Sequence, residues 1–213
     1  MDLVILFLGS FGIGLSGAIM PGPMFTMTIA ETARRGFRSG PLLVLGHGIV
    51  EAVVVAGLVV GLSQLIQHAA VKGTVALLGG LVLVWMGYGM SRAAWSGSIS
   101  LAAAAAGAPR GPGPIPAGAL LSVANPYWLL WWATVGAAYV ATALQHGPLG
   151  LASFFGGHIL ADLAWFSLVA LLVVSGRRIL NDRLYRGLIL VCAVFLVALG
   201  LWFVASGVAF LRG

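Results

Sequence analysis

Charged side chains are scarce in this sequence. They make up 8% of its 213 residues and only 5 residues are acidic, whereas 61% are hydrophobic. The mean hydropathy is +1.08. A soluble domain of this size could not bury so much apolar surface, and the gaps between charges suit membrane spans of ~20 residues. The composition therefore predicts an all-α protein that crosses a lipid membrane several times.

Cysteine is nearly absent, and so are the motifs of common enzymes. Cys192 is the only cysteine, which excludes an intramolecular disulfide and a CxxC thiol relay. The sequence has no nucleophile motif and no cofactor motif, so we expect neither an enzyme nor a bound cofactor. Basic residues are also missing from the N-terminus, which turns apolar directly after Asp2. This favours a retained first span over a cleaved signal peptide.

Six apolar segments are long enough to cross a bilayer with some tilt. They comprise residues 3–31, 40–66, 71–91, 116–142, 148–175 and 187–211. The stretch between the third and fourth segments is rich in Ala, Gly, Ser and Pro, which is typical of a flexible linker. We therefore expect one transmembrane domain (1–213) made of a first repeat (1–92), a cytoplasmic linker (93–115) and a second repeat (116–213).

Loop charges predict the orientation. The first, third and fifth loops hold nine basic residues, which are Arg34, Arg35, Arg38, Arg92, Arg110, Arg177, Arg178, Arg183 and Arg186. The opposite side has only Lys72 and Arg212. By the positive-inside rule, both termini lie outside the cell. The net charge of +6 then reflects topology and anionic lipid rather than nucleic acid. Glu31, close to Arg34 in sequence, is expected to form a solvated ion pair at the cytoplasmic edge.

Prolines interrupt two of the predicted spans. Pro21-Gly22-Pro23 lies in the first span, and Asn125-Pro126 lies near the centre of the fourth. Proline removes an amide donor and clashes with the preceding turn, so neither stretch can continue a regular helix. In hydrocarbon, the freed backbone groups must be satisfied by protein or by a water-filled cavity. Broken helices at membrane depth are common at the binding sites of transporters.

The span after each break carries a histidine and an acid at the same spacing. His47 precedes Glu51 by four residues, His158 precedes Asp162 by four, and each histidine follows a glycine. Each half of the chain thus has a broken helix, a His/acid helix and a plain helix. Because three spans per half is an odd number, the halves must cross the membrane in opposite orientations. The pattern predicts two inverted three-helix repeats, an architecture of secondary transporters.

The two breaks predict a binding site. A helix that restarts after either break presents amide donors and the positive end of its dipole, which suit a carboxylate. The side chain of Asn125 can cap a helix or bind a ligand. Trp128 can offer cation–π contacts to an ammonium group, although packing explains such aromatic residues equally well. The prolines could also simply kink the helices for packing. The candidate substrate-binding residues are Pro21, Gly22, Pro23, Asn125, Pro126 and Trp128.

The His/acid pairs predict proton coupling. Residues four apart share a helical face, and a charge within a span costs at least ~2.5–3.5 kcal/mol. Since histidine titrates near neutral pH, we expect His47, Glu51, His158 and Asp162 to carry coupling protons or to bind the cationic part of a substrate. Two alternatives are open: polar pairs that only lock helices together, and a divalent-metal site built from these four residues.

In these residues the sequence resembles members of the LysE-type amino-acid exporter superfamily, which includes lysine/arginine and homoserine/threonine efflux proteins. The resemblance rests on Pro21-Gly22-Pro23, on Asn125-Pro126-Tyr127-Trp128 and on the Gly-His-x-x-x-acid helices, and it covers essentially the whole chain. It implies proton-coupled export of amino acids or similar small metabolites across the cytoplasmic (inner) membrane of a bacterium or archaeon. It also implies a homodimer. Many members of the better known branches carry less ionisable residues at the His/acid helices, so the resemblance predicts the fold more closely than the substrate.

The sequence thus predicts a secondary transporter that exports a small amino-acid-like metabolite. A divalent-metal exporter using the same four polar side chains is the main alternative. A membrane enzyme and a scaffold without transport activity are two further alternatives from other classes. No resident metal is predicted, because the sequence has no His-rich loop and no cysteine cluster.

Overall fold

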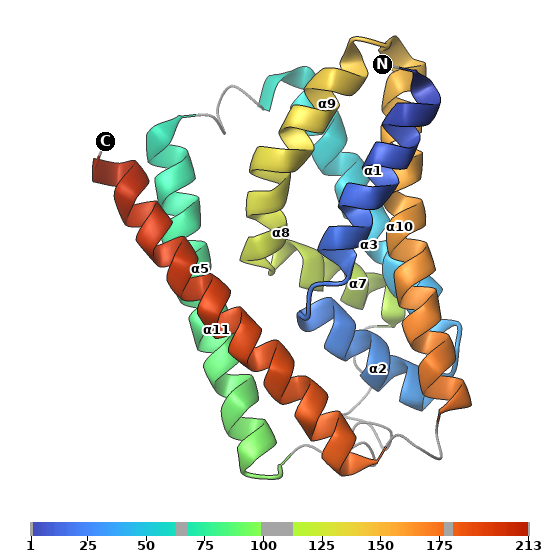
Figure 1. The fold of residues 1–213 in the computed structure, drawn as a ribbon, viewed down its shortest axis with the longest axis vertical. Helices are drawn as coiled ribbons and strands as arrows, with labels where there is room; N and C mark the ends of the chain where they lie inside the picture. The colour runs from blue at the N-terminus through green and yellow to red at the C-terminus, as the bar shows by residue number, and fades with distance from the viewer. Residues whose placement is uncertain (1, 63–67, 99–112, 177–180, 213) are drawn as a thin grey trace.

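The computed structural model describes residues 2–62, 68–98, 113–176 and 181–212, and within these ranges the chain is helical without strands. Its long helices lie roughly side by side (Figure 1). The helices are α1 (Leu3–Ala18), α2 (Pro23–Arg35), α3 (Ser39–Gly57), α5 (Ala69–Trp95), α7 (Pro114–Val123), α8 (Pro126–Trp131), α9 (Ala137–Leu144), α10 (Gly147–Ser175) and α11 (Asp182–Arg212). Two π-helical turns extend α3 and join α8 to α9: η1 (Leu58–Leu62) and η2 (Trp132–Gly136).

The apolar helices account for the predicted membrane spans. Five of them are long and apolar enough to cross a bilayer, and the count rises to six if α1 and α2 form one bent span. This confirms an all-α polytopic membrane protein. α7 is apolar but only 10 residues long, too short to cross hydrocarbon alone. Residues 99–112 of the predicted linker lie outside the described residues.

The first predicted break bends the chain sharply. α1 ends at Ala18, α2 begins at Pro23, and the two axes differ by 77°. Gly22 precedes α2 in an extended conformation, and Pro23 occupies the first helical position, where its missing amide costs no hydrogen bond. α2 therefore runs across the molecule beneath α1 instead of continuing it (Figure 1).

The second predicted break separates α7 from α8. α7 ends at Val123, and Asn125 caps α8 by accepting a hydrogen bond from the backbone amide of Tyr127 at 3.1 Å. Pro126 is the first residue of α8. The fourth predicted span is therefore a helix of 10 residues followed by a capped restart, as its proline predicts.

The helices pack as pairs held by small residues. α1 packs along α10, α3 along α7, and α5 along α11. A Cβ at Gly46 of α3 would overlap the carbonyl oxygen of Ile115 in α7, and one at Gly157 of α10 would overlap that of Phe7 in α1. Each of these glycines directly precedes a histidine of the predicted site. Glycine thus allows the close contact that sets the height of the next side chain.

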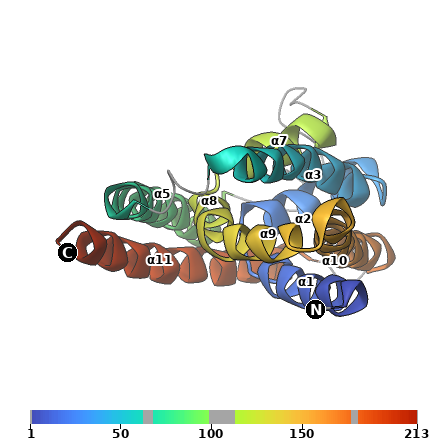
Figure 2. The ribbon, with the colours of Figure 1, turned by 90° about the horizontal axis from the view of Figure 1, so that it is seen from above.

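The α5/α11 pair lies to one side of the other helices (Figures 1 and 2). Its two helices also meet at glycine, since a Cβ at Gly80 would lie 2.6 Å from the carbonyl oxygen of Gly200. The pair contacts the remaining helices through α5 against α8 and through α11, where Phe203 stacks on Tyr127 of α8. The fold is therefore a tightly packed pair of helices beside a bundle that contains both broken spans.

Glu31 forms the expected ion pairs with Arg34 and Arg35, but the prediction that its side chain is solvated is wrong. The Glu31 side chain is only 6% exposed, with Oε1 at 2.6 Å from Arg34 Nη1 and Oε2 at 2.8 Å from Arg35 Nε. Its backbone carbonyl accepts a hydrogen bond from Ser39 Oγ at 3.0 Å. The bend after α1 explains the difference, because it lays α2 against α3 and α10. A straight span would have exposed this residue at its end.

Replacing Gly157 by alanine tests the α1–α10 contact. The added methyl group would push against the Phe7 backbone, and overpacking of this kind costs about 1–3 kcal/mol. We expect Gly157→Ala to unfold at a lower temperature in detergent than the wild-type protein. Gly12→Ala is the matched control, since nothing lies within 4 Å of a Cβ there. Equal melting temperatures for the two variants would contradict the close contact.

Candidate functional site

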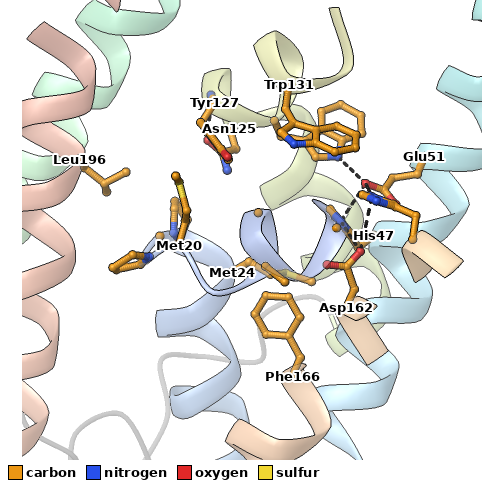
Figure 3. Close-up of a pocket in the computed structure, with 18 of the residues that line it drawn as sticks. Met20, Met24, His47, Glu51, Asn125, Tyr127, Trp131, Asp162, Phe166 and Leu196 are labelled. Carbon is orange, nitrogen blue, oxygen red and sulfur yellow. Dashed lines mark hydrogen bonds and ion pairs between the residues drawn. The ribbon is translucent and has the colours of Figure 1, made fainter. Parts of the chain in front are cut away.

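A cavity of about 80 Å³ lies where the two broken spans meet α3, α10 and α11. Figure 3 shows its acidic and histidine side chains at one end, and Met20 and Leu196 on the other side. Its lining comprises Gly14, Gly17, Ala18, Met20, Pro21, Gly22, Pro23, Met24, His47, Glu51, Asn125, Tyr127, Trp128, Trp131, His158, Asp162, Phe166, Phe195 and Leu196. The structure thus brings the predicted break residues and all four predicted His and acid side chains to one cavity. Pro126, the first residue of α8, is the one predicted break residue that is not among the lining residues.

The four ionisable residues form one cluster rather than two separate pairs. Glu51 Oε1 lies 3.0 Å from His47 Nε2 and 3.2 Å from His158 Nε2. Asp162 Oδ2 lies 3.6 Å and 3.7 Å from the same two nitrogen atoms. The spacing along each helix predicted the two pairs within α3 and α10. It could not predict that the two helices face each other at this height.

Two indole groups complete the surroundings of Glu51. Trp128 Nε1 and Trp132 Nε1 each donate a hydrogen bond to Glu51 Oε1 at 3.0 Å. The carboxylate is 1% exposed, so these donors replace the water that a buried charge loses. Trp128 was predicted to contact substrate. Its hydrogen bond to the acid is a role that the sequence did not indicate.

Ser122 fixes the position of the His47 ring. Its hydroxyl donates to the carbonyl oxygen of Gly118 at 2.7 Å and also contacts His47 Nδ1. The other ring nitrogen of His47, Nε2, faces Glu51 Oε1 at 3.0 Å. A ring nitrogen and a carboxylate oxygen in hydrogen-bond contact share one proton, which either of the two groups can carry.

Three polar atoms of the cluster have no hydrogen-bond partner in the described part of the chain. They are Glu51 Oε2, Asp162 Oδ2 and His158 Nδ1. The His158 ring packs on Trp131, with centroids 4.7 Å apart. Buried polar atoms without a partner are rare and call for a ligand, a water molecule or a proton. At the acidic end of the cavity, Glu51 Oε2 and Asp162 Oδ2 can therefore each accept a further hydrogen bond from a bound cation.

The same side chains have the composition of a metal site. One ligand atom each from His47, Glu51 and Asp162 lie within 4.8 Å of one another, and His158 lies beside them. The contact between Ser122 and His47 Nδ1 also orients the ring as in many metal sites. Against this, Glu51 Oε1 already accepts two indole hydrogen bonds.

Sequence reasoning missed two residues of the site, Ser122 and Gly14. Ser122 lies three residues before Asn125, and this spacing was the available signal. Trp132 lies four residues after Trp128, which predicts that the two rings share a helical face along a substrate path but not that both bind Glu51. Gly14 gave no signal, yet a Cβ there would lie 2.8 Å from His158 Nδ1. It is therefore the absence of a side chain on α1 that makes room for the His158 ring.

Comparison with known proteins indicates the family to which the chain belongs. Residues 15–207 match the model of the LysE type translocator family. The chain is 31% identical to the chemotactic transduction protein ChpE of Pseudomonas aeruginosa over 199 residues, 92% of this chain and 96% of ChpE. It is 30% identical to the threonine efflux protein of Escherichia coli over 170 residues, 79% of this chain and 82% of that protein.

A third relative is the putative amino acid efflux protein YcgF of Bacillus subtilis, 25% identical over 209 residues, 98% of this chain and 99% of YcgF. No solved structure matches the chain significantly.

A double-mutant cycle tests the hydrogen bonds around Glu51. Glu51→Ala leaves two buried indole N–H groups without their acceptor, at about 1–3 kcal/mol for each unsatisfied group. We expect thermal unfolding in detergent to show a marked loss of stability. Trp128→Phe should then cost less in the Glu51→Ala background than in the wild-type protein, because its partner is already absent. Additive effects of the two substitutions would contradict the contact.

Proposed function

The chain belongs to the LysE type translocator family, and we propose on this basis that it exports a small amino-acid-like metabolite from the cytoplasm in exchange for protons. Its family consists of transporters, and its apolar helices make it a multi-pass membrane protein. The observation that carries the proposal is the single cavity in which two helix starts lie beside four proton-binding side chains.

The two helix starts are suited to a substrate carboxylate. The first turn of any helix leaves amide groups without an intrahelical acceptor, and Met24 in the first turn of α2 lines the cavity. No lysine or arginine is among the lining residues. In this proposal the substrate carboxylate is bound by backbone amides at the start of α2, and Asn125 holds the start of α8 in place.

The acidic cluster is suited to the substrate ammonium group. The cluster sets two carboxylates beside two histidines, so its net charge changes with the number of protons that it holds. An arriving ammonium group is attracted to Glu51 Oε2 and Asp162 Oδ2, which have no hydrogen-bond partner among the described residues. It then competes directly with the bound proton, because both are cations that need the same carboxylates. Competition for one site is the basis of exchange transport.

The helix pairing supports alternating access between two inverted repeats. Exchanging the halves converts the α1–α10 pair into the α3–α7 pair, and it maps the α5–α11 pair onto itself. Such repeats rock about a central site. In this proposal the repeats are 1–92 and 116–213, joined by a cytoplasmic linker. The protein works as a homodimer in the inner membrane with both termini outside.

Divalent-metal export is the second candidate function. It is favoured by the ligand atoms of His47, Glu51 and Asp162, which lie within 4.8 Å of one another. Imidazole and carboxylate ligands together suit several first-row transition metals. The substrate would then be the ion itself, bound where the first proposal puts the ammonium group.

Transport assays in proteoliposomes test whether Glu51 and Asp162 couple transport to protons. Glu51→Gln and Asp162→Asn remove the charges that bind proton and ammonium, so we expect each to lose at least tenfold in pH-gradient-driven amino-acid transport. Asp182→Asn is the matched control, because this acid is exposed at the start of α11 and does not line the cavity. Full gradient-driven transport by both cavity variants would refute proton coupling at this cluster.

Metal-dependent stabilisation separates the two candidate functions. If the chain carries a metal ion, Mn²⁺ or Zn²⁺ should raise the melting temperature in detergent, and His47→Gln should abolish the shift. His146→Gln is the control, since this residue does not line the cavity. An amino-acid exporter should instead show no metal-dependent shift that His47→Gln removes.

A further inference from the structure

A second, larger cavity adjoins the candidate site. Its volume is about 530 Å³, and it lies between α2, α10 and α11. No Asp, Glu, Lys or Arg is among its lining residues, which are Ile19, Pro21, Phe25, Ile29, Trp165, Val169, Leu172, Val173, Gly176, Leu184, Leu188, Val191 and Cys192. The proposed function makes no use of this cavity.

The two cavities share a wall and follow one another along α11. Pro21 lines both of them. On α11, Cys192 lines the larger cavity, whereas Phe195 and Leu196, one helical turn further, line the smaller one. A molecule that leaves the larger cavity along α11 therefore arrives at the end of the site formed by Met20, Phe195 and Leu196.

The larger cavity extends toward the connection between α10 and α11. Gly176 directly follows α10, and Leu184 lies in the first turn of α11. Arg183 and Arg186 lie at the same end of α11, on the side that the positive-inside rule assigns to the cytoplasm. The cavity thus lies between that side and the candidate site, where an exporter must admit its substrate.

The two ends of the site differ in chemistry. Figure 3 shows Glu51 and Asp162 on one side, with Leu196 on the other. The lining contains no acid besides these two, and no lysine or arginine. A second positive charge on the substrate would therefore find no carboxylate at the Leu196 end. Asn125 and Tyr127 are the polar side chains on that side (Figure 3), so a side-chain hydroxyl would exchange water for few partners. An apolar side chain fits both this end and the larger cavity.

We propose that the substrate is a zwitterionic amino acid with a branched or long apolar side chain, and that the larger cavity is its entrance from the cytoplasm. This rests on the proposed export function and narrows its substrate class. The ammonium group binds at Glu51 and Asp162, and the side chain lies against Met20, Phe195 and Leu196. The threonine efflux relative handles a smaller, hydroxylated side chain, so the proposal distinguishes the two proteins.

Counterflow in proteoliposomes measures the substrate class. Vesicles loaded with leucine, threonine or lysine are compared by uptake of the same radiolabelled amino acid. Apolar pockets discriminate about tenfold or more per methylene group, so we expect leucine exchange to exceed threonine and lysine exchange at least tenfold. Preference for threonine or lysine would overturn this inference and leave the export function intact. Exchange of no amino acid at all would refute the export function itself.

Thiol labelling of Cys192, the only cysteine of the chain, tests from which side of the membrane the larger cavity can be reached. Cys192 lines the larger cavity, although the residue is only 1% exposed, so a small membrane-impermeant thiol reagent should label it slowly, and only from the cytoplasmic side, in inside-out vesicles. Leucine should slow that labelling more than lysine does. Leu188→Cys in a Cys192→Ser background gives a second reporter on the same cavity wall, and Cys192→Ser alone gives the background.

Labelling of both reporters only by a lipid-soluble maleimide, without protection by leucine, would show that the cavity holds lipid chains. Labelling from the outside only would place the cavity on the exit path. Either result would overturn the assignment of the entrance.

Discussion

The buried carboxylate of Glu51 is the interaction on which the rest of the site depends. Nitrogen atoms from α3, α8, η2 and α10 all lie within 3.2 Å of one of its oxygen atoms. A buried charge without such partners costs several kcal/mol. The broken fourth span must therefore take a position at which its indole groups reach α3, and α10 must face the same point. One acid thus ties together helices from both halves of the chain.

Elementary chemistry predicted the helices and their two interruptions well. Because proline cannot continue a regular helix, its positions predicted the breaks at Pro21-Gly22-Pro23 and Asn125-Pro126. The four-residue spacing of His47 and Glu51 likewise predicted one shared face. The sequence did not predict the 77° turn of α2, because the angle after a break depends on tertiary packing. The burial of Glu31 was missed for this reason.

The convergence of the cluster was not predictable from local patterns. Glu51 and His158 are separated by 107 positions, and the packing of α3 against α10 sets their relative height, since a Cβ at Gly40 would lie 2.7 Å from the carbonyl oxygen of Phe166. Ser122 and Trp132 belong to the site because α7 and η2 lie against α3. The spacing of Trp132 from Trp128 indicates a shared face, but no local pattern indicates which helix that face meets. The residue types therefore predicted the principal chemical groups, and helix packing determined their partners.

Pro21 forms part of the wall of both cavities, so the two cavities are mechanically connected through the first helix break. Any occupant that moves this break changes the shape of both spaces at once. If an occupant of the apolar cavity lowers the affinity of the site for its ligand, then that ligand lowers the affinity of the cavity for the occupant by the same factor. A hydrophobic small molecule that is seated there and moves the break would consequently change the affinity of the site for its substrate, in addition to blocking the proposed entrance.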